Sequence, residues 1–289
     1  TKKKPPFIIS RNMYLVTRNR LLIAFLLTII FVILLWRSAI FVYLTQQEGY
    51  SNDTTTRFFV INMDKDKERY NNILKYYQNS DFSNEKLNRF SGINGKAIVP
   101  DNYLTSDALN ELHLIEKNGY RTHHHSLTRG GIGCFLSHYY LANELLKEKS
   151  NVDAYLIFED DTRIFPNTYT QIKDSMKTVP DDWDIVLFYT IRAVGHSQNK
   201  TFNKIKSFWG MNCYLINKNG AKKFVEEVDN IKLDGQVDCY LSRMIQQKKL
   251  HVYSTKKQFI ACNSTDTNIQ TLLKPQKGVD PFDYNGYKV

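Results

Sequence analysis

The stretch that decides the fold is Asp153–Asp161, DAYLIFEDD. Its middle part, Tyr155–Phe158, is apolar and aromatic or branched, and such a short run bounded by polar residues is typical of a buried strand. Three consecutive carboxylates, Glu159, Asp160 and Asp161, close it. The stretch therefore predicts a buried strand whose carboxyl end carries a concentration of negative charge.

Strands and helices are expected to alternate on both sides of this stretch. A strand over 57–63 (RFFVINM) precedes a helix over 64–79, and a helix over 132–149 leads into the 153–159 strand. A helix over 168–177, strands over 184–189 and 211–216, and a helix over 219–228 follow. Such alternation predicts an α/β domain with a mainly parallel sheet and flanking helices, in the manner of a Rossmann-type fold. Residues 94–130 have weak patterning and are expected to form an elaborated region between core elements.

Open α/β sheets bind ligands at the carboxyl ends of their strands. Asn62 ends the first predicted strand and Arg69 follows shortly after it, while Glu159–Asp161 end the second. We therefore expect both groups in one cleft. Hard oxygen ligands suit magnesium or manganese, so the three carboxylates are candidate metal ligands. The alternative is a solvated acidic turn, because Asp is common in turns.

The N-terminal part of the chain has the features of a membrane anchor. Leu21–Trp36 contains no charge, and after Arg37 the apolar character continues to Leu44. At about 1.5 Å per residue, residues 21–44 are long enough to span a bilayer. A cleaved signal peptide is the alternative, although the bulky residues that end the run do not suit a cleavage site.

Flanking charge predicts the orientation of this anchor. Six Lys or Arg residues lie in the tail over 1–20, which favours a cytoplasmic tail and a type II protein with its domain in the lumen of an ER- or Golgi-type compartment. Residues 45–56 are expected to form a stem and residues 57–289 the domain. Three Asn-x-Ser/Thr sequons and all the cysteines lie on the predicted lumenal side, at Asn52, Asn199, Asn263, Cys134, Cys213, Cys239 and Cys262.

The net charge of +10 does not indicate a nucleic-acid partner. Residues 1–56 carry seven basic and two acidic side chains, so half of the excess lies in the tail, in and beside the predicted anchor, and in the stem. The other half is spread over 233 residues without a basic block, which is ordinary for a globular domain.

Several blocks of the sequence, taken in order, resemble glycosyltransferase family 25, which includes lipooligosaccharide and procollagen galactosyltransferases. The resemblance covers roughly residues 57–265. It rests on FFVINMDKDKERY (58–70), RFSGINGK (89–96), RGGIGCFLSHYYLANELL (129–146), YLIFEDDTRIF (155–165) with WDIVLFY (183–189), WGMNCYLINKNGAKKF (209–224) and LDGQVDCYL (233–241).

This resemblance implies a GT-A fold, a UDP-sugar donor that is usually UDP-galactose, a divalent metal, and inversion at the transferred hexose. It assigns the metal and diphosphate role to Asp160 and Asp161 with Glu159 beside them, and a place in the nucleotide half of the cleft to Asn62 and Arg69. Asp238 becomes the candidate for acceptor contact or general base, because inversion needs a group that deprotonates the attacking hydroxyl. Some GT-A enzymes also use a late histidine on the metal, which makes His251 a weaker candidate.

Several functional alternatives stay open from the sequence. Ser137 and His138 are candidates for donor binding by the resemblance, but they equally suit buried hydrogen bonds that brace the cleft. Glycines 130, 131 and 133 offer a phosphate close approach to a helix N-terminus. Asn212 stands where the family often has a small residue or Thr, which bears on the sugar pocket. The chain as a whole is expected to be an enzyme acting on a glycan or glycoprotein hydroxyl, with a non-catalytic binding protein of the same fold or a nucleotide-sugar phosphohydrolase as alternatives.

Overall fold

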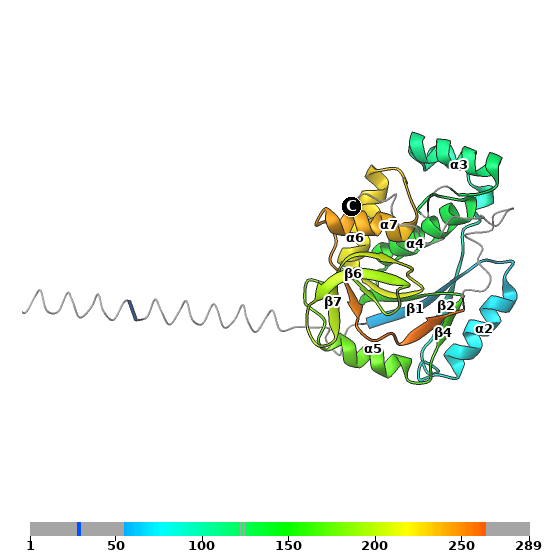
Figure 1. Ribbon diagram of the computed structural model, residues 1–289. Coiled ribbons are helices and arrows are strands. Elements are labelled where there is room, and N and C mark those ends of the chain that lie inside the picture. The colour runs from blue at the N-terminus through cyan, green and yellow to red at the C-terminus, as the bar shows by residue number, and fades with distance from the viewer. Residues whose placement is uncertain (1–27, 30–54, 122, 124, 264–289) are drawn as a thin grey trace, which may run out of the picture. The chain divides into compact units, whose positions relative to one another are not determined.

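The computed structural model describes residues 28–29, 55–121, 123 and 125–263 (Figure 1). The chain divides into two units, Thr1–Glu48 and Gly49–Val289. Thr28 and Ile29 are helical, but the rest of the predicted anchor over 21–44 and nearly all of the stem lie outside the described residues. No helix within the described residues has the length and apolar character needed to cross a membrane.

The second unit is an α/β domain built on an eight-stranded sheet with the order β2-β1-β3-β8-β5-β9-β7-β6. The strands of this sheet are β1 (Thr55–Asn62), β2 (Leu87–Ser91), β3 (Val152–Glu159), β5 (Ile185–Leu187), β6 (Arg192–Ser197), β7 (Phe202–Trp209), β8 (Cys213–Asn217) and β9 (Val252–Thr255). A separate two-stranded sheet pairs β4 (Thr162–Ile164) with β10 (Ile260–Cys262). The helices are α2 (Lys67–Gln78), α3 (Ser106–Asn118), α4 (Arg129–Lys147), α5 (Thr168–Met176), α6 (Lys218–Asn230) and α7 (Val237–Gln246), with short 3₁₀ turns η1 (Gly95–Ala97) and η2 (Pro100–Asn102).

The prediction of a mainly parallel sheet with flanking helices is confirmed, and one strand direction is corrected. β1 runs parallel to both β2 and β3, and β5 runs parallel to β9. β8 is antiparallel to its neighbours β3 and β5, and β7 is antiparallel to β9 and β6, so these two strands oppose the other six. The segment expected as a parallel strand over 211–216 is thus the antiparallel β8.

Two apolar layers form the core, one on each face of the sheet. Figure 1 shows α4, α6 and α7 over one face, while α2 and α5 cover the other. β3 alternates between them: Tyr155 and Ile157 pack into the first layer, whereas Leu156 and Phe158 pack into the second, and all four are buried. A continuous apolar run is therefore what a strand covered on both faces needs.

Several boundaries differ from those expected. β1 begins at Thr55, so the last two residues of the predicted stem belong to the domain. The helix predicted over 132–149 is α4, which begins at Arg129, because Thr128 caps it by accepting a 3.0 Å hydrogen bond from the backbone N–H of Gly131. The elaborated region over 94–130 contains η1, η2 and α3.

Two glycines allow the segment after β2 to lie directly on the first turns of α4. A Cβ built on Gly133 would come within 2.3 Å of the carbonyl oxygen of Ile93, and one on Gly95 within 1.7 Å of the carbonyl oxygen of Arg129. The backbone of α4 and the backbone of the segment after β2 therefore approach each other too closely for a side chain to fit between them. This contact positions residues 92–96 as a wall of the site described next.

Candidate functional site

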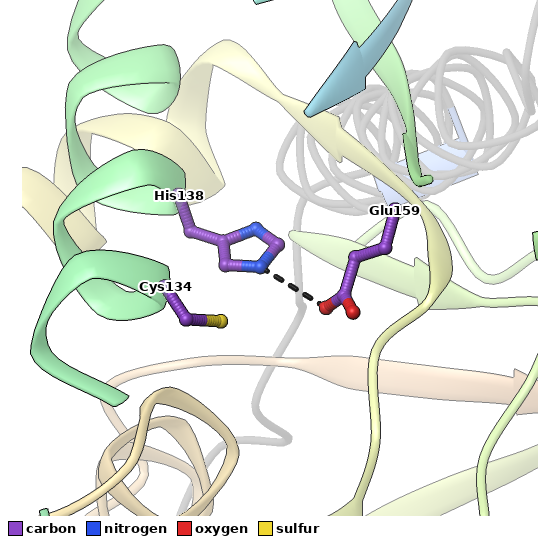
Figure 2. Close-up of side chains that lie close together, drawn as sticks. All are labelled: Cys134, His138 and Glu159. Carbon is purple, nitrogen blue, oxygen red and sulfur yellow. Dashed lines mark hydrogen bonds and ion pairs between the residues drawn. The ribbon is translucent and has the colours of Figure 1, made fainter. Parts of the chain in front are cut away.

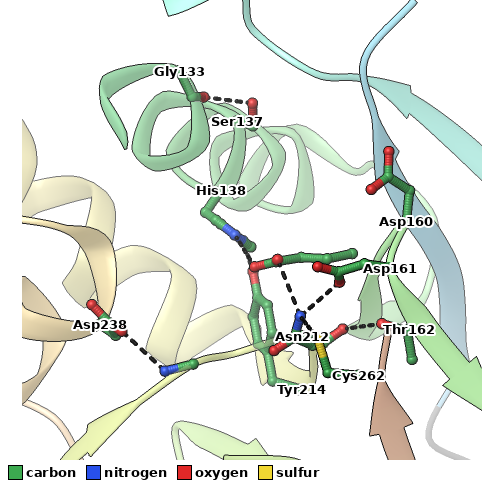
Figure 3. A network of polar contacts seen from close by, with 12 residues as sticks. Gly133, Ser137, His138, Asp160, Asp161, Thr162, Asn212, Tyr214, Asp238 and Cys262 are labelled. Atoms are coloured by element: carbon green, nitrogen blue, oxygen red, sulfur yellow. Dashed lines mark hydrogen bonds and ion pairs between the residues drawn. The ribbon is translucent and has the colours of Figure 1, made fainter. Parts of the chain in front are cut away.

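The three predicted metal ligands lie together at the carboxyl end of β3. The strand ends at Glu159, and Asp160 and Asp161 form the turn into β4 (Figure 3). All three line a cavity of about 410 Å³. The turn thus directs a cluster of carboxylates into one concave space instead of out to solvent.

Asn62 and Arg69 reach this cluster from β1 and α2, as the strand-end rule predicted. The Asn62 amide nitrogen donates a 2.7 Å hydrogen bond to Oδ2 of Asp160. The Arg69 guanidinium makes an ion pair with Asp160 and a second, at 3.5 Å, with Oδ2 of Asp161. The expectation that the two strand ends share one cleft is therefore confirmed.

Asn62 is fully engaged within the protein. Besides Asp160, its Nδ2 donates to the carbonyl oxygen of Asp66 at 3.0 Å, while its Oδ1 accepts 2.9 Å from Nε of Arg89. Arg89, on β2, also pairs with Asp64 at 2.6 Å and lowers the pKa of that exposed carboxylate. Asn62 is only 2% exposed. Its geometry suits it to orient Asp160, and Arg89 extends this network to the edge of the sheet.

Asn212, which precedes the antiparallel strand β8, holds the other side of the carboxylate turn. Its Nδ2 donates to Oδ1 of Asp161 at 2.7 Å and lies 3.4 Å from Oε2 of Glu159. Its carbonyl oxygen accepts 2.8 Å hydrogen bonds from the backbone N–H of Glu159 and from the hydroxyl of Thr162. Asn212 thus contacts the carboxylates directly.

Burial and mutual repulsion raise the pKa of the aspartates at this turn. The pKa of Asp160 is raised chiefly by burial, against the lowering effect of Arg69 and Asn62. Burial and then the charge of Glu159 raise the pKa of Asp161 from 3.8 to about 6, although Asn212 and Arg69 partly oppose them. Closely spaced buried carboxylates resist ionisation together, so a cation brought among them would be bound favourably.

Ser137 and His138 lie on the cavity side of α4 and take part in internal hydrogen bonds. The Ser137 hydroxyl donates to the carbonyl oxygen of Gly133 at 2.7 Å and accepts from the backbone N–H of Ile93 at 2.8 Å. His138 connects the hydroxyl of Tyr214, 2.8 Å from its Nδ1, to Glu159, whose Oε1 lies 3.3 Å from its Nε2. These internal hydrogen bonds agree with the alternative that the two residues brace the cleft. Contact of either residue with a donor stays a prediction.

Cationic side chains and backbone line the same cavity as the carboxylates. The basic residues there are Lys65, Arg69 and Lys96, and the segment 92–96 supplies backbone. Among the three predicted glycines only Gly130 lines the cavity, since Gly131 bonds to the helix cap and Gly133 faces η1. A space lined by both cations and carboxylates suits an anionic ligand that carries or accompanies a metal.

Asp238 is not among the residues that line this cavity. It lies in the first turn of α7, where Oδ2 accepts 3.0 Å from the backbone N–H of Gly210 and Oδ1 accepts 2.9 Å from that of Cys239. Burial raises the pKa of this carboxyl, which is 9% exposed. Its role as a base stays a prediction, while its contacts anchor the turn that precedes Asn212.

The structure places His251 away from the carboxylates. It directly precedes β9, and β9 runs in the same direction as β3. His251 therefore lies at the amino ends of these strands, whereas Glu159 lies at the carboxyl end of β3. Its ring Nδ1 is 2.8 Å from Asp182, and its backbone N–H donates to Asp184. The weaker expectation that it contributes a metal nitrogen is therefore wrong.

The sequence patterns assigned no contact with the carboxylates to four residues that lie at the site: Arg89, Asn212, Tyr214 and Cys134. Arg89 lies on β2, a strand that the pattern did not predict, and its only signal was its place at the head of the RFSGINGK block. Asn212 was noted only as a departure from the family. Tyr214 and Cys134 read as core residues, and nothing in their local sequence marks them as neighbours of a carboxylate.

Comparison with known proteins identifies the family of this chain. Residues 55–241 match the family model of glycosyltransferase family 25 (LPS biosynthesis protein). A glycosyltransferase 25 family member of Aedes aegypti is 28% identical over 200 residues, covering 65% of this chain and 31% of that protein. Procollagen galactosyltransferase 2 of Homo sapiens is 27% identical over 58% of this chain and 27% of its own length. Procollagen galactosyltransferase 1-A of Xenopus laevis is 29% identical over 46% and 23%, respectively.

The chain thus matches less than a third of the length of each of these relatives. Residues 55–241, which match the family model, contain β1, the carboxylate turn after β3, Asn212 and Asp238. Since the family model matches well over half of the chain, the chain belongs to glycosyltransferase family 25.

Proposed function

We propose that this chain is a glycosyltransferase that moves galactose from UDP-galactose to a hydroxyl of a glycan or glycoprotein, with manganese as cofactor and inversion at the transferred carbon. Family membership supports transfer of a sugar, and the names of the procollagen galactosyltransferases favour galactose. The observation that carries the proposal is the convergence of Glu159, Asp160 and Asp161 with basic side chains in one cavity.

The residues at the turn after β3 fit a divalent metal. They supply carboxylate oxygens only, the hard ligands that manganese and magnesium prefer. Burial and, after it, the charge of neighbouring carboxylates raise the pKa of Asp160 and Asp161, and a dication would relieve the part of the rise that comes from repulsion. When bound, the metal would neutralise the negative charge that develops on the diphosphate leaving group.

The protein's own side chains have separate parts in this proposal. Asn62 and Asn212 hold Asp160 and Asp161 in place from opposite sides. Lys65 and Lys96 are positioned to attract phosphate oxygens, because both line the cavity. In transfer, the acceptor oxygen bonds to the anomeric carbon as the bond to the diphosphate breaks, and a carboxylate takes the hydroxyl proton. We retain Asp238 as the proposed base.

The decisive experiment measures UDP release by the purified full chain with manganese and a panel of UDP-sugars, with and without acceptors. Thermal shift first identifies the donor, since a bound ligand stabilises the native state. UDP-galactose should stabilise the protein most, and a galactosylated product should form from a suitable acceptor. The double variant Asp160→Asn with Asp161→Asn serves as the control and should show neither effect.

Two results would count against the proposal. UDP release that no acceptor accelerates, with free galactose as the product, would indicate a phosphohydrolase or hydrolase activity. A chain that no nucleotide-sugar stabilises in manganese would favour the non-catalytic alternative. Stabilisation by a different UDP-hexose would keep transfer and overturn only the assignment of galactose.

A further inference from the structure

Three side chains with different metal-binding atoms face one another in the wall of the cavity (Figure 2). Cys134 and His138 are four residues apart and therefore lie on the same face of α4, and Glu159 reaches them from the end of β3. The sulfur, a ring nitrogen and a carboxylate oxygen all lie within 4.8 Å of one another. Thiolate, imidazole and carboxylate are the three ligand types that zinc takes in proteins.

The spacing is close to that of a tetrahedral zinc centre. Metal–ligand bonds of about 2.0–2.3 Å place the ligand atoms of a tetrahedron about 3.3–3.8 Å apart. The pair formed by Nε2 of His138 and Oε1 of Glu159 is already at 3.3 Å. The Cys134 sulfur, at 4.8 Å or less from the other two atoms, needs to approach them by about 1.5 Å at most. The cavity beyond the three side chains leaves room for a water as the fourth ligand.

His138 is held in the orientation that such a site requires. It is 1% exposed, and its Nδ1 lies 2.8 Å from the hydroxyl of Tyr214. With Nε2 on a cation, Nδ1–H donates to the Tyr214 oxygen, and histidine ligands of metals almost always donate their second ring N–H in this way. Tyr214 is itself buried and fixed in β8, so the ring cannot turn freely.

The charge around Cys134 also favours a cation. The carboxyl groups of Glu159, Asp238, Asp161 and Asp160 all act electrostatically on the Cys134 thiol. The same negative surroundings attract a divalent ion, which then stabilises the thiolate by direct coordination.

We propose that Cys134, His138 and Glu159 form a binding site for a thiophilic divalent cation, Zn²⁺ being the best match to the ligand set. The site is distinct from the manganese site proposed above but shares Glu159 with it. Zinc at this position withdraws Glu159 from the neighbouring carboxylates and lies in the wall of the donor cavity. Zinc is therefore expected to lower manganese-dependent transfer; this consequence rests on the proposed function, whereas binding itself does not.

Cobalt(II) is the probe for the test, because a cobalt–thiolate bond gives a charge-transfer absorption that carboxylate or water ligands do not give. The full chain titrated with Co²⁺ should develop this band at one equivalent, and Zn²⁺ should abolish it by displacement. Cys134→Ser should lose the band. Cys262→Ser is the matched control, since that cysteine also lies beside the carboxylates, 3.3 Å from Nδ2 of Asn212, and it should keep the band.

Tyr214→Phe tests the outer hydrogen bond without removing a ligand. It should weaken zinc binding about 10–100-fold, the usual effect of losing an outer-shell partner, while the cobalt band keeps its shape. Because a variant can fail to fold, the site is also tested in the wild-type chain by the alkylation of its cysteines. Zinc should slow alkylation of Cys134 far more than that of Cys262, as followed by mass spectrometry of the peptides.

The proposal is overturned if the wild-type chain shows no cobalt–thiolate band, if Cys262→Ser and not Cys134→Ser removes it, or if zinc protects only Cys262. Failure of the proposed function is distinguishable from these results. A chain that binds no UDP-sugar in manganese but still gives the Cys134-dependent band keeps the zinc site and loses only the transferase assignment.

Discussion

The amide of Asn212 donates a 2.7 Å hydrogen bond to Asp161, although the two residues are 51 positions apart in the chain. The contact exists because β8 is antiparallel to β3, so the residue that precedes β8 lies beside the residues that follow β3. It is one of the contacts that stabilise the charged form of Asp161 against burial and the charge of Glu159. The protonation of Asp161 should therefore decide how the site responds to pH.

Manganese affinity should fall as the pH is lowered through about 6. The pKa of Asp161 in the metal-free protein is about 6, and a metal must displace the proton from a ligand that carries one. We expect the apparent affinity to drop about tenfold for each pH unit below 6, for one proton displaced. Electron paramagnetic resonance of free Mn²⁺ between pH 5 and 7.5 measures this. A constant affinity across that range would contradict the prediction.

Asp161→Asn should affect stability and metal binding in opposite directions. Because the folded-state pKa lies above the ordinary value of 3.8, the wild-type carboxyl contributes stability below pH 3.8 and loses it as the pH rises towards 6. At pH 7.5 with chelator, the neutral amide avoids this penalty, so the free energy of unfolding should rise by about 1–3 kcal/mol. Stabilisation by manganese should disappear. Chemical denaturation with and without manganese measures both changes, and a less stable metal-free variant would refute the first.

Gly133→Ala should destabilise the domain without touching any ligand. The added methyl group would meet the carbonyl oxygen of Ile93 at 2.3 Å, so α4 and the segment 92–96 must separate. Overpacking of this kind costs roughly 1–3 kcal/mol. Gly131→Ala is the matched control in the same helical turn, since its nearest neighbours are 3.5 Å away. Equal melting temperatures for the two variants would show that the glycine contact is not needed.

Asp238→Asn separates chemistry from binding. If Asp238 is the base, the variant should keep donor affinity and lose transfer by about 10²–10⁴, measured as kcat at saturating donor. Asp234→Asn is the comparison, because Asp234 is more exposed and pairs with Arg243. If the variant instead keeps its kcat but binds the donor more weakly or melts at a lower temperature, the role of Asp238 is to anchor the turn at Gly210.

The sequence predicted the elements that carry long apolar runs and the place where their ends meet. β1, α4 and β3 have strong periodicity or continuous apolar character, and the convergence of Asn62 and Arg69 with the carboxylates follows from parallel strand ends. The pattern failed where elements are amphipathic or exposed: β6 is exposed along its whole length, and β2 is only partly buried. A local sequence pattern also does not determine the direction of a strand. For this reason β8 was expected to run parallel, and the position of Asn212 beside the carboxylates could not be derived.

The ion pairs of Arg69 with Asp160 and Asp161 have a consequence for the protein in the absence of the proposed metal. Without a nearby positive charge, the repulsion among three carboxylates at one turn would oppose folding. The Arg69 guanidinium supplies that charge from within the chain. Folding should therefore not depend on binding of the proposed metal. The chain should tolerate synthesis and storage under metal starvation and regain its full complement by simple addition, without refolding.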